Sequence, residues 1–155
     1  MKTKVISAFP GTGKSWAFNN LKDEYTMLDS DSSNFSWIGE EGERHPDFPK
    51  NYIKHIKSNI GKVDFIFVSS HAVVREALKK AKIKFILVYP HKNRKEEYIK
   101  KYRDRNSSEA FIKLLDENWN EWISECENDK NTDLKRILFA DSNLANILES
   151  IKLNS

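Results

Sequence analysis

The residues best suited to chemistry lie near the start of the chain, in the segment AFPGTGKS at positions 8–15. Gly11 and Gly13 allow a backbone loop to curl so that successive N–H groups point inward at phosphate oxygens. Lys14 can reach the outer phosphates of a polyphosphate as a point charge, and the Ser15 hydroxyl can ligate Mg²⁺. A helix that begins after the loop adds the partial positive charge of its N-terminus. The segment therefore predicts a phosphate-binding loop.

This segment matches the Walker A pattern in the variant where Ala8 replaces the first glycine. The alternative is a glycine turn followed by an accidental Lys-Ser pair. The setting favours phosphate binding, because an apolar strand predicted over 4–9 precedes the loop and a helix predicted over 15–22 follows it. We expect six residues to bind the nucleotide: Pro10, Gly11, Thr12, Gly13, Lys14 and Ser15.

Two carboxylates stand two residues apart directly after the next apolar segment, a strand predicted over 25–28. Asp29 can hold Mg²⁺ through water together with Ser15, and Asp31 can orient or deprotonate a hydroxyl group of the acceptor. The alternative is a pair of capping or turn residues in a polar loop, since Asp is common in turns. Because the phosphate loop lies upstream, we expect Lys14, Asp29 and Asp31 to be catalytic and Asp31 also to contact the acceptor.

The elements that must position these residues follow an alternating pattern. Strands are predicted over 4–9, 25–28, 63–68, 83–89 and 134–140. Helical spacing of apolar residues lies between them, in the segments 15–22, 52–60, 74–81, 94–105 and 108–125 and after a capping Ser142. Strands that alternate with helices indicate βαβ crossovers and a parallel sheet covered on both faces. We expect a three-layer α/β fold with an irregular segment over 36–50.

The ends of the later strands bear on the class of phosphate-binding protein. Motor ATPases carry an acid that organises magnesium at the end of a later apolar strand. The predicted strands over 63–68 and 83–89 are followed by SSH and PH, without an acid, and only the last strand is followed by one, Asp141. A motor ATPase is therefore disfavoured.

The AFPGTGKS loop followed by LDSD resembles the P-loop kinases of the shikimate, gluconate and nucleoside monophosphate kinase type, and the polynucleotide 5′-hydroxyl kinases have a similar arrangement. The Lys- and Asn-rich chain also resembles small ATP-binding kinases of phages. The resemblance implies a P-loop NTPase fold with strand order 2-3-1-4-5 and a helical lid after the fourth strand, here about 91–108. It implies that Arg103 and Arg105 of the lid are catalytic, and that Asp141 lies in a loop bordering adenine.

The same resemblance implies an acceptor-binding region at about 30–60. Phe35 and Trp37 could stack on a base, and Arg44 could hold an acceptor phosphate. Arg75 is predicted to point to the same side of the sheet and do likewise, and His71 follows the third strand where site residues gather. The alternatives are exposed loop charges, aromatics that pin a long loop to the core, and a His71 that caps a helix.

Length, composition and charge limit the kinds of protein that this chain can be. A length of 155 residues suits one domain over 1–155, and no stretch approaches 18 consecutive apolar residues, so no membrane partner is expected. The single cysteine, Cys126, excludes an internal disulfide framework and favours a reducing cytoplasm. Within a formal charge of +3, the segment 92–105 carries seven basic and three acidic residues, and the segment 116–133 carries one basic and seven acidic residues. The positive excess in the predicted lid favours a bound nucleotide over a general nucleic-acid surface.

We therefore expect an enzyme that uses ATP and Mg²⁺ and moves the γ-phosphate to a small acceptor, with a nucleoside or nucleotide favoured. Two alternatives remain open. In the first, the acceptor is a 5′-hydroxyl of DNA or RNA. In the second, the protein is a non-catalytic module whose partner binds only one nucleotide state.

Overall fold

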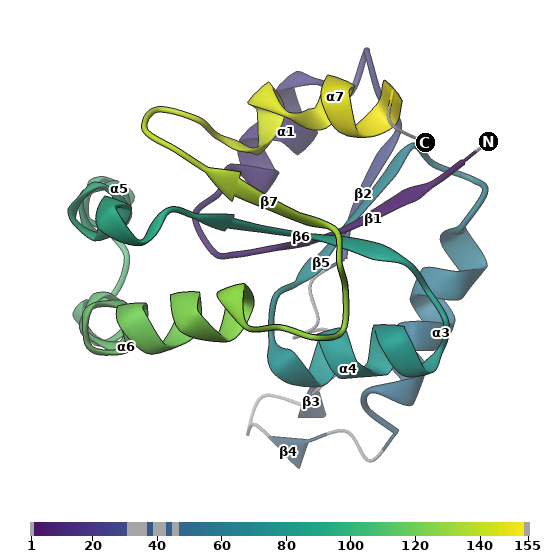
Figure 1. Cartoon of the computed structure of the whole chain (residues 1–155), viewed down its shortest axis with the longest axis horizontal. Coiled ribbons are helices and arrows are strands. Elements are labelled where there is room, and N and C mark those ends of the chain that lie inside the picture. The colour runs from purple at the N-terminus through teal and green to yellow at the C-terminus, as the bar shows by residue number, and fades with distance from the viewer. Residues whose placement is uncertain (1, 31–36, 39–42, 45–46, 154–155) are drawn as a thin grey trace.

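A central sheet of five parallel strands organises the protein (Figure 1). The computed structural model describes residues 2–30, 37–38, 43–44 and 47–153. The strands are β1 (Lys4–Ala8), β2 (Met27–Asp29), β5 (Phe65–Ser69), β6 (Phe85–Pro90) and β7 (Lys135–Leu138). They lie in the order β2-β5-β1-β6-β7, which is 2-3-1-4-5 when the strands of this sheet are counted along the chain. The predicted strand order is confirmed.

Helices cover both faces of the sheet. They are α1 (Lys14–Asn20), α3 (Lys50–Asn59), α4 (Ala72–Lys80), α5 (Lys95–Asp104), α6 (Glu109–Glu127) and α7 (Leu148–Leu153), with 3-10 turns η1 (Lys92–Arg94) and η2 (Leu144–Asn146). In Figure 1, α1 and α7 lie above the sheet, α3, α4 and α6 lie below it, and α5 lies beyond the carboxyl end of β6. The three-layer α/β prediction is confirmed. None of the helices in the described ranges is both long and apolar enough to cross a membrane.

Alternation along the strands divides the core into two clusters. Successive strand residues point to opposite faces, so Val5 and Ile6 enter different clusters. Ile6 packs with Phe65 and Leu148 on the side of α1 and α7, whereas Val5 packs with Trp119 on the side of α3, α4 and α6. Both clusters are closed to water, which fixes the sheet between its helices and gives the strand ends a rigid base.

The register brings the carboxyl ends of three strands to one edge. Ala8, the last residue of β1, lies opposite Ser69 of β5 and Val88 of β6. Asp29, the last residue of β2, lies opposite Phe67 of β5. The loops that follow β1, β2 and β5 therefore leave the sheet side by side.

Two local expectations differ from the structure. Ser142 does not cap the last helix: Asn143 and Asn146 form a reciprocal capping box around η2, and α7 begins only at Leu148. The segment 36–50, expected to be irregular, contains a short antiparallel pair, β3 (Trp37–Ile38) and β4 (Glu43–Arg44). Sequence patterns locate such short elements poorly, because two hydrogen-bonded residues leave no periodicity to detect.

Candidate active site

The loop between β1 and α1 is held by its own backbone conformation and by a neighbouring loop. Gly11 and Gly13 have φ of +83° and +99°, in the left-handed region where a side chain is disfavoured. The Thr12 hydroxyl is buried and donates to the Phe9 carbonyl at 2.8 Å, so it stabilises the loop from within. The Leu144 N–H donates to the Thr12 carbonyl at 2.8 Å and fastens the loop to η2. These contacts fix the conformation of the loop.

A cavity of about 440 Å³ opens where the carboxyl ends of β1, β2 and β5 meet. Many of the predicted site residues line it: Pro10, Gly11, Gly13, Lys14, Ser15, Asp29, His71 and Arg105. Tyr102 and Phe111, from α5 and α6, also contribute to its wall. Open α/β sheets bind their ligands at this edge, and the volume lies within the usual range for small-molecule sites.

Two oxygen-bearing side chains in this cavity suit a magnesium ion. Ser15 lies in the first turn of α1 and Asp29 ends β2, and both line the cavity. Hydroxyl and carboxylate oxygens are ligands that Mg²⁺ prefers, with water and substrate phosphates completing its shell. Within the described ranges, no group of three or more His, Cys, Asp and Glu side chains could hold a metal ion. Magnesium here would therefore depend on the phosphates it accompanies.

Helix α5 lies directly against the phosphate loop. A Cβ built at Gly11 would lie 3.1 Å from a ring carbon of Tyr98 and 3.1 Å from a ring carbon of Tyr102. A side chain at this position would require these rings to shift, so Gly11 serves close approach as well as a left-handed φ. Tyr98 is fully buried. Among the buried side-chain polar atoms of the described residues, its hydroxyl oxygen is the one without a hydrogen-bond partner.

Ionic contacts tie α5 to the loops around it. The buried Arg94 guanidinium donates to the carbonyls of Leu138 and Ser142 at 3.1 and 2.9 Å, and it pairs with Glu97. Hydrogen bonding from Arg94 lowers the pKa of the Glu97 carboxyl below its ordinary value. Glu97 in turn lies 3.7 Å from the Lys101 ammonium. The start of α5 is thereby fixed to the loop that follows β7.

Lys101 continues this chain of contacts to the phosphate loop. Its ammonium lies 3.1 Å from Asn143 Oδ1, 3.4 Å from the Gly11 carbonyl oxygen and 4.3 Å from the centroid of the Tyr98 ring. Burial lowers the pKa of Lys101 below its ordinary value, because the charged form loses hydration. One cation therefore links α5, the phosphate loop and the loop after β7.

The two lid arginines predicted from the sequence have different positions. The Arg105 guanidinium lies 5.5 Å from the Tyr102 ring centroid and lines the cavity. Arg103 is exposed and does not line the cavity. On a helix the spacing of four residues from Lys101 to Arg105 keeps them on one face, which Arg103 does not share.

Asp141 and His71 flank the loop and the cavity. Asp141 is exposed, has φ of +62° and does not line the cavity. Its neighbour Asn143 lies 3.6 Å from a Cβ built at Gly13, so the segment after β7 does border the phosphate loop. His71 lines the cavity and precedes α4, and its backbone carbonyl accepts the Val74 N–H at 3.0 Å.

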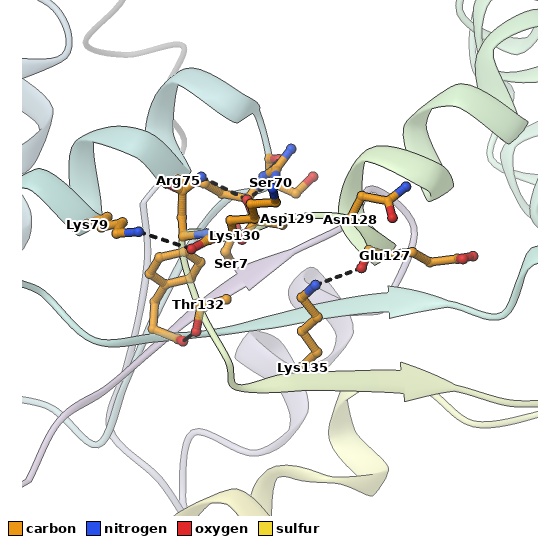
Figure 2. A network of polar contacts seen from close by, with 12 residues as sticks. Ser7, Ser70, Arg75, Lys79, Glu127, Asn128, Asp129, Lys130, Thr132 and Lys135 are labelled. Carbon is orange, nitrogen blue, oxygen red and sulfur yellow. Dashed lines mark hydrogen bonds and ion pairs between the residues drawn. The ribbon is translucent and has the colours of Figure 1, made fainter.

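Arg75 has a partner within the fold (Figure 2). Its Nη1 donates to Asp129 Oδ1 at 2.5 Å, and its Nε donates to the Ser70 carbonyl at 2.8 Å. The two paired side chains are 4% and 1% exposed. This arrangement does not support the predicted contact between Arg75 and an acceptor phosphate, because that contact would leave the buried Asp129 carboxylate unpaired.

The predicted acceptor residues fall in a segment that is described only in part. Asp31 and Phe35 lie outside the described residues. Trp37 and Arg44 lie on β3 and β4 and are backbone partners in that antiparallel pair. The neighbouring Ser30 is buried, and its carbonyl accepts the Tyr52 hydroxyl at 2.5 Å. This bond anchors the end of β2 to α3 at the base of the region.

Sequence reasoning missed the residues through which α5 contacts the loop, namely Tyr98, Lys101, Tyr102 and Asn143. A signal for three of them was present. Tyr98, Lys101 and Tyr102 follow Arg94 at the i+4, i+7 and i+8 positions of one helix face, and Arg105 follows at i+11, so the face that carries Arg105 also carries these three residues. Asn143 gave no such signal, because its place depends on how the chain turns after β7.

Comparison with known proteins identifies the fold of this chain through a solved structure. No protein-family model matches the chain, and no curated protein matches it. Among solved structures, a gluconokinase from Sinorhizobium meliloti 1021 superposes with a TM-score of 0.56 over 99% of this chain and 94% of that chain, at 12% sequence identity. The chain therefore has the fold of a P-loop kinase, with its phosphate loop at the carboxyl edge of the sheet.

Proposed function

We propose that this protein is a P-loop kinase that transfers the γ-phosphate of ATP to the hydroxyl group of a small acceptor. The observation that carries the proposal is the cavity of about 440 Å³, which joins Lys14 and Ser15 of the phosphate loop to Asp29 and Arg105. These groups come from β1–α1, β2 and the end of α5, so the fold gathers a candidate phosphate cradle, candidate metal ligands and a positive charge in one cavity. The gluconokinase fold supports the same class of reaction.

In the proposed reaction the acceptor oxygen forms a bond to the γ-phosphorus while the bond to the β–γ bridging oxygen breaks, and ADP leaves. The loop N–H groups and Lys14 neutralise the β- and γ-phosphates, and Arg105 stabilises the charge that spreads over the transferred group. Asp31 takes the proton of the acceptor hydroxyl. Ser15 and Asp29 would hold Mg²⁺, which would offset the negative charge of the phosphates when bound.

The segment over 91–108 would serve as the lid and the segment over 30–60 as the acceptor region. Contacts of α5 with Gly11 through Tyr98 and Tyr102 support the first assignment, because they couple the position of α5 to the loop that holds the phosphates. The hydrogen bond from the Tyr52 hydroxyl to the Ser30 carbonyl supports the second, since it ties α3 to the end of β2, where Asp29 lines the cavity.

For the acceptor, a nucleoside or nucleotide is our first candidate and a sugar acid the second. The aromatic and basic residues of 30–60 favour a nucleotide. The structural similarity to a gluconokinase favours a sugar acid. The Arg75–Asp129 pair favours it too, because Arg75 is then not available to bind an acceptor phosphate. A nucleoside and a sugar acid each have a hydroxyl group that Asp31 would deprotonate, whereas a nucleotide would accept on its phosphate.

The test is transfer of label from [γ-³²P]ATP to a panel of nucleosides, deoxynucleoside monophosphates, gluconate, shikimate and 5′-hydroxyl oligonucleotides. We expect label in one small acceptor, with the rate falling about 10²- to 10³-fold in Lys14→Ala. Lys22→Ala is the matched control, since Lys22 is exposed after α1 and does not line the cavity. Transfer that persists in Lys14→Ala, or that is unchanged in Asp31→Asn, would contradict the mechanism.

Two further outcomes of the same panel would replace the proposal. Label found only in oligonucleotides would make the protein a polynucleotide kinase. Tight ATP binding without transfer to any acceptor would make it a nucleotide-dependent binding module, and the next experiment would then be a search for a partner that binds one nucleotide state.

A further inference from the structure

The edge of the sheet opposite the phosphate loop is hollowed by two adjoining cavities. One, of about 510 Å³, lies between the segments that lead into β6 and β7, and the other, of about 460 Å³, lies beside the start of β1. Lys84, Phe85 and Leu134 line both of them. The two cavities therefore adjoin at these residues, and we call them together the amino-edge groove.

The residues that line this groove carry many more positive than negative charges. Six lysines line it: Lys2, Lys4, Lys79, Lys82, Lys84 and Lys130. Asp133 is the acid among its described lining residues. The Lys79 ammonium donates to the Lys130 carbonyl at 3.1 Å, which holds these two rim segments together (Figure 2). Such a local excess of one sign raises the concentration of polyanions at the surface.

Two nearby carboxylates, Asp64 and Asp129, do not offset this charge, because each is already paired with another group. Asp64, which precedes β5 at the same edge, lies 3.3 Å from the Lys152 ammonium and accepts the Thr26 N–H at 2.9 Å. Asp129, just before Lys130, is buried against Arg75. The groove lysines therefore remain the dominant charges at this edge.

The floor of the groove is apolar. Val5 and Phe85 form its buried part, and Ile60 and Leu134 are 42% and 51% exposed. A basic rim over an apolar floor suits a ligand with regularly spaced negative charges on one side and flat apolar surfaces on the other. Phosphates and nucleobases along a nucleic-acid strand have this character.

We propose that the amino-edge groove binds the phosphate backbone of a single-stranded nucleic acid. A linear polymer can continue from one cavity into the adjoining one, whereas a flat lipid surface would rest on the rim and leave the floor uncovered. Lysines are point charges without the fixed fork that reads a base edge, and the described lining has no exposed aromatic ring on which bases could stack. Binding is therefore independent of sequence and governed by salt.

This groove is separate from the proposed kinase site. β1 runs from Lys4 at the groove to Ala8 at the phosphate-loop cavity, and these four residue steps span about 13 Å. A strand bound in the groove therefore leaves the nucleotide cavity open. The proposal consequently stands whether or not the kinase activity is found.

The test measures binding of a fluorescein-labelled oligodeoxynucleotide of about 20 nucleotides, longer than a single-strand site of about 4–16, by anisotropy. Salt is varied from about 50 to 200 mM. We compare Lys84→Gln/Lys130→Gln with Lys22→Gln/Lys113→Gln, whose lysines are exposed and lie outside the groove. Each double variant has a formal charge of +1, from +3 less two lysines. We expect the slope of log K against log salt to fall by about 1.4 in the first variant, two contacts at about 0.7 each, and to stay unchanged in the second.

Three results would overturn the proposal. Equal slopes in both double variants would show that total charge, rather than the groove, attracts the oligonucleotide. Competition by saturating ATP, or loss of binding in Lys14→Ala, would assign the oligonucleotide to the phosphate-loop cavity. Binding to vesicles containing phosphatidylserine without binding to the oligonucleotide would assign the groove to a lipid surface.

Discussion

At the scale of single residues, Arg105 and Arg103 lie two positions apart at the end of α5, so substitutions at the two can be compared directly. Arg105 lines the cavity and Arg103 points elsewhere on the helix surface. Arg105→Gln should lower the rate of phosphoryl transfer about 10²-fold, because it removes the charge that we propose stabilises the transferred group. Arg103→Gln should leave the rate within a factor of two or so, as expected of an exposed residue without a role in the site. Initial rates at saturating ATP check both variants, and an equal loss in the two would contradict the assignment.

Cys126 provides a prediction about pH at the same scale. Burial raises the pKa of its thiol to about 11, above the ordinary value of about 8.5. A raised pKa in the folded protein contributes stability that is complete below the unfolded value and is lost as pH rises toward the folded one. Wild-type protein should therefore lose stability relative to Cys126→Ala between about pH 8.5 and 11. Urea unfolding of both proteins across this range measures the difference, and parallel curves would refute it.

At the scale of elements, the Arg75–Asp129 pair joins α4 to the end of α6 beneath the site. Asp129→Ala should lower the free energy of unfolding by about 3–5 kcal/mol, because it leaves a buried guanidinium without its partner. Asp133→Ala is the matched control, since Asp133 is exposed a few residues away and should change stability by no more than about 0.5 kcal/mol. Replacing both members, in Arg75→Met/Asp129→Leu, should cost less than Asp129→Ala alone. Chemical denaturation gives all three values.

At the scale of the whole molecule, the phosphate loop should couple nucleotide binding to folding. ATP with Mg²⁺ at 100 times its Kd should raise the free energy of unfolding by about 2.7 kcal/mol, because it binds the folded state alone. For a domain of this size that corresponds to a rise in Tm of about 5–10 °C. Lys14→Ala should abolish the rise, and chelation of Mg²⁺ with EDTA should reduce it. A thermal-shift assay measures each case, and a rise that survives in Lys14→Ala would place the nucleotide elsewhere.

Much of the fold was predictable because its signals are local. Apolar runs such as VDFIFV mark strands buried on both faces, and the alternation of strands with helices indicates a parallel sheet. The phosphate loop was predictable for the same reason: glycines, Lys14 and Ser15 do their work within one continuous segment. The strand order came instead from the resemblance to P-loop kinases, and the structure confirms it.

The contacts between distant segments were not predictable, because they depend on where whole elements come to lie. Arg75 has the spacing of a site residue, yet its guanidinium meets Asp129, 54 positions further along the chain. Lys101 looks like one cation among several in a basic segment, yet it alone among them bridges Gly11 and Asn143 in the described structure.

The distribution of charge best separates what can be read from the sequence from what depends on the tertiary structure. By itself the sequence determined a phosphate-binding loop, an α/β fold and a basic excess over 92–105, since each belongs to neighbouring residues. Only the tertiary structure decided that Lys2, Lys84 and Lys130 line one groove at the far edge of the sheet. The physical reason is that parallel strands collect all their amino ends at one edge and all their carboxyl ends at the other, so residues far apart in the chain become neighbours there.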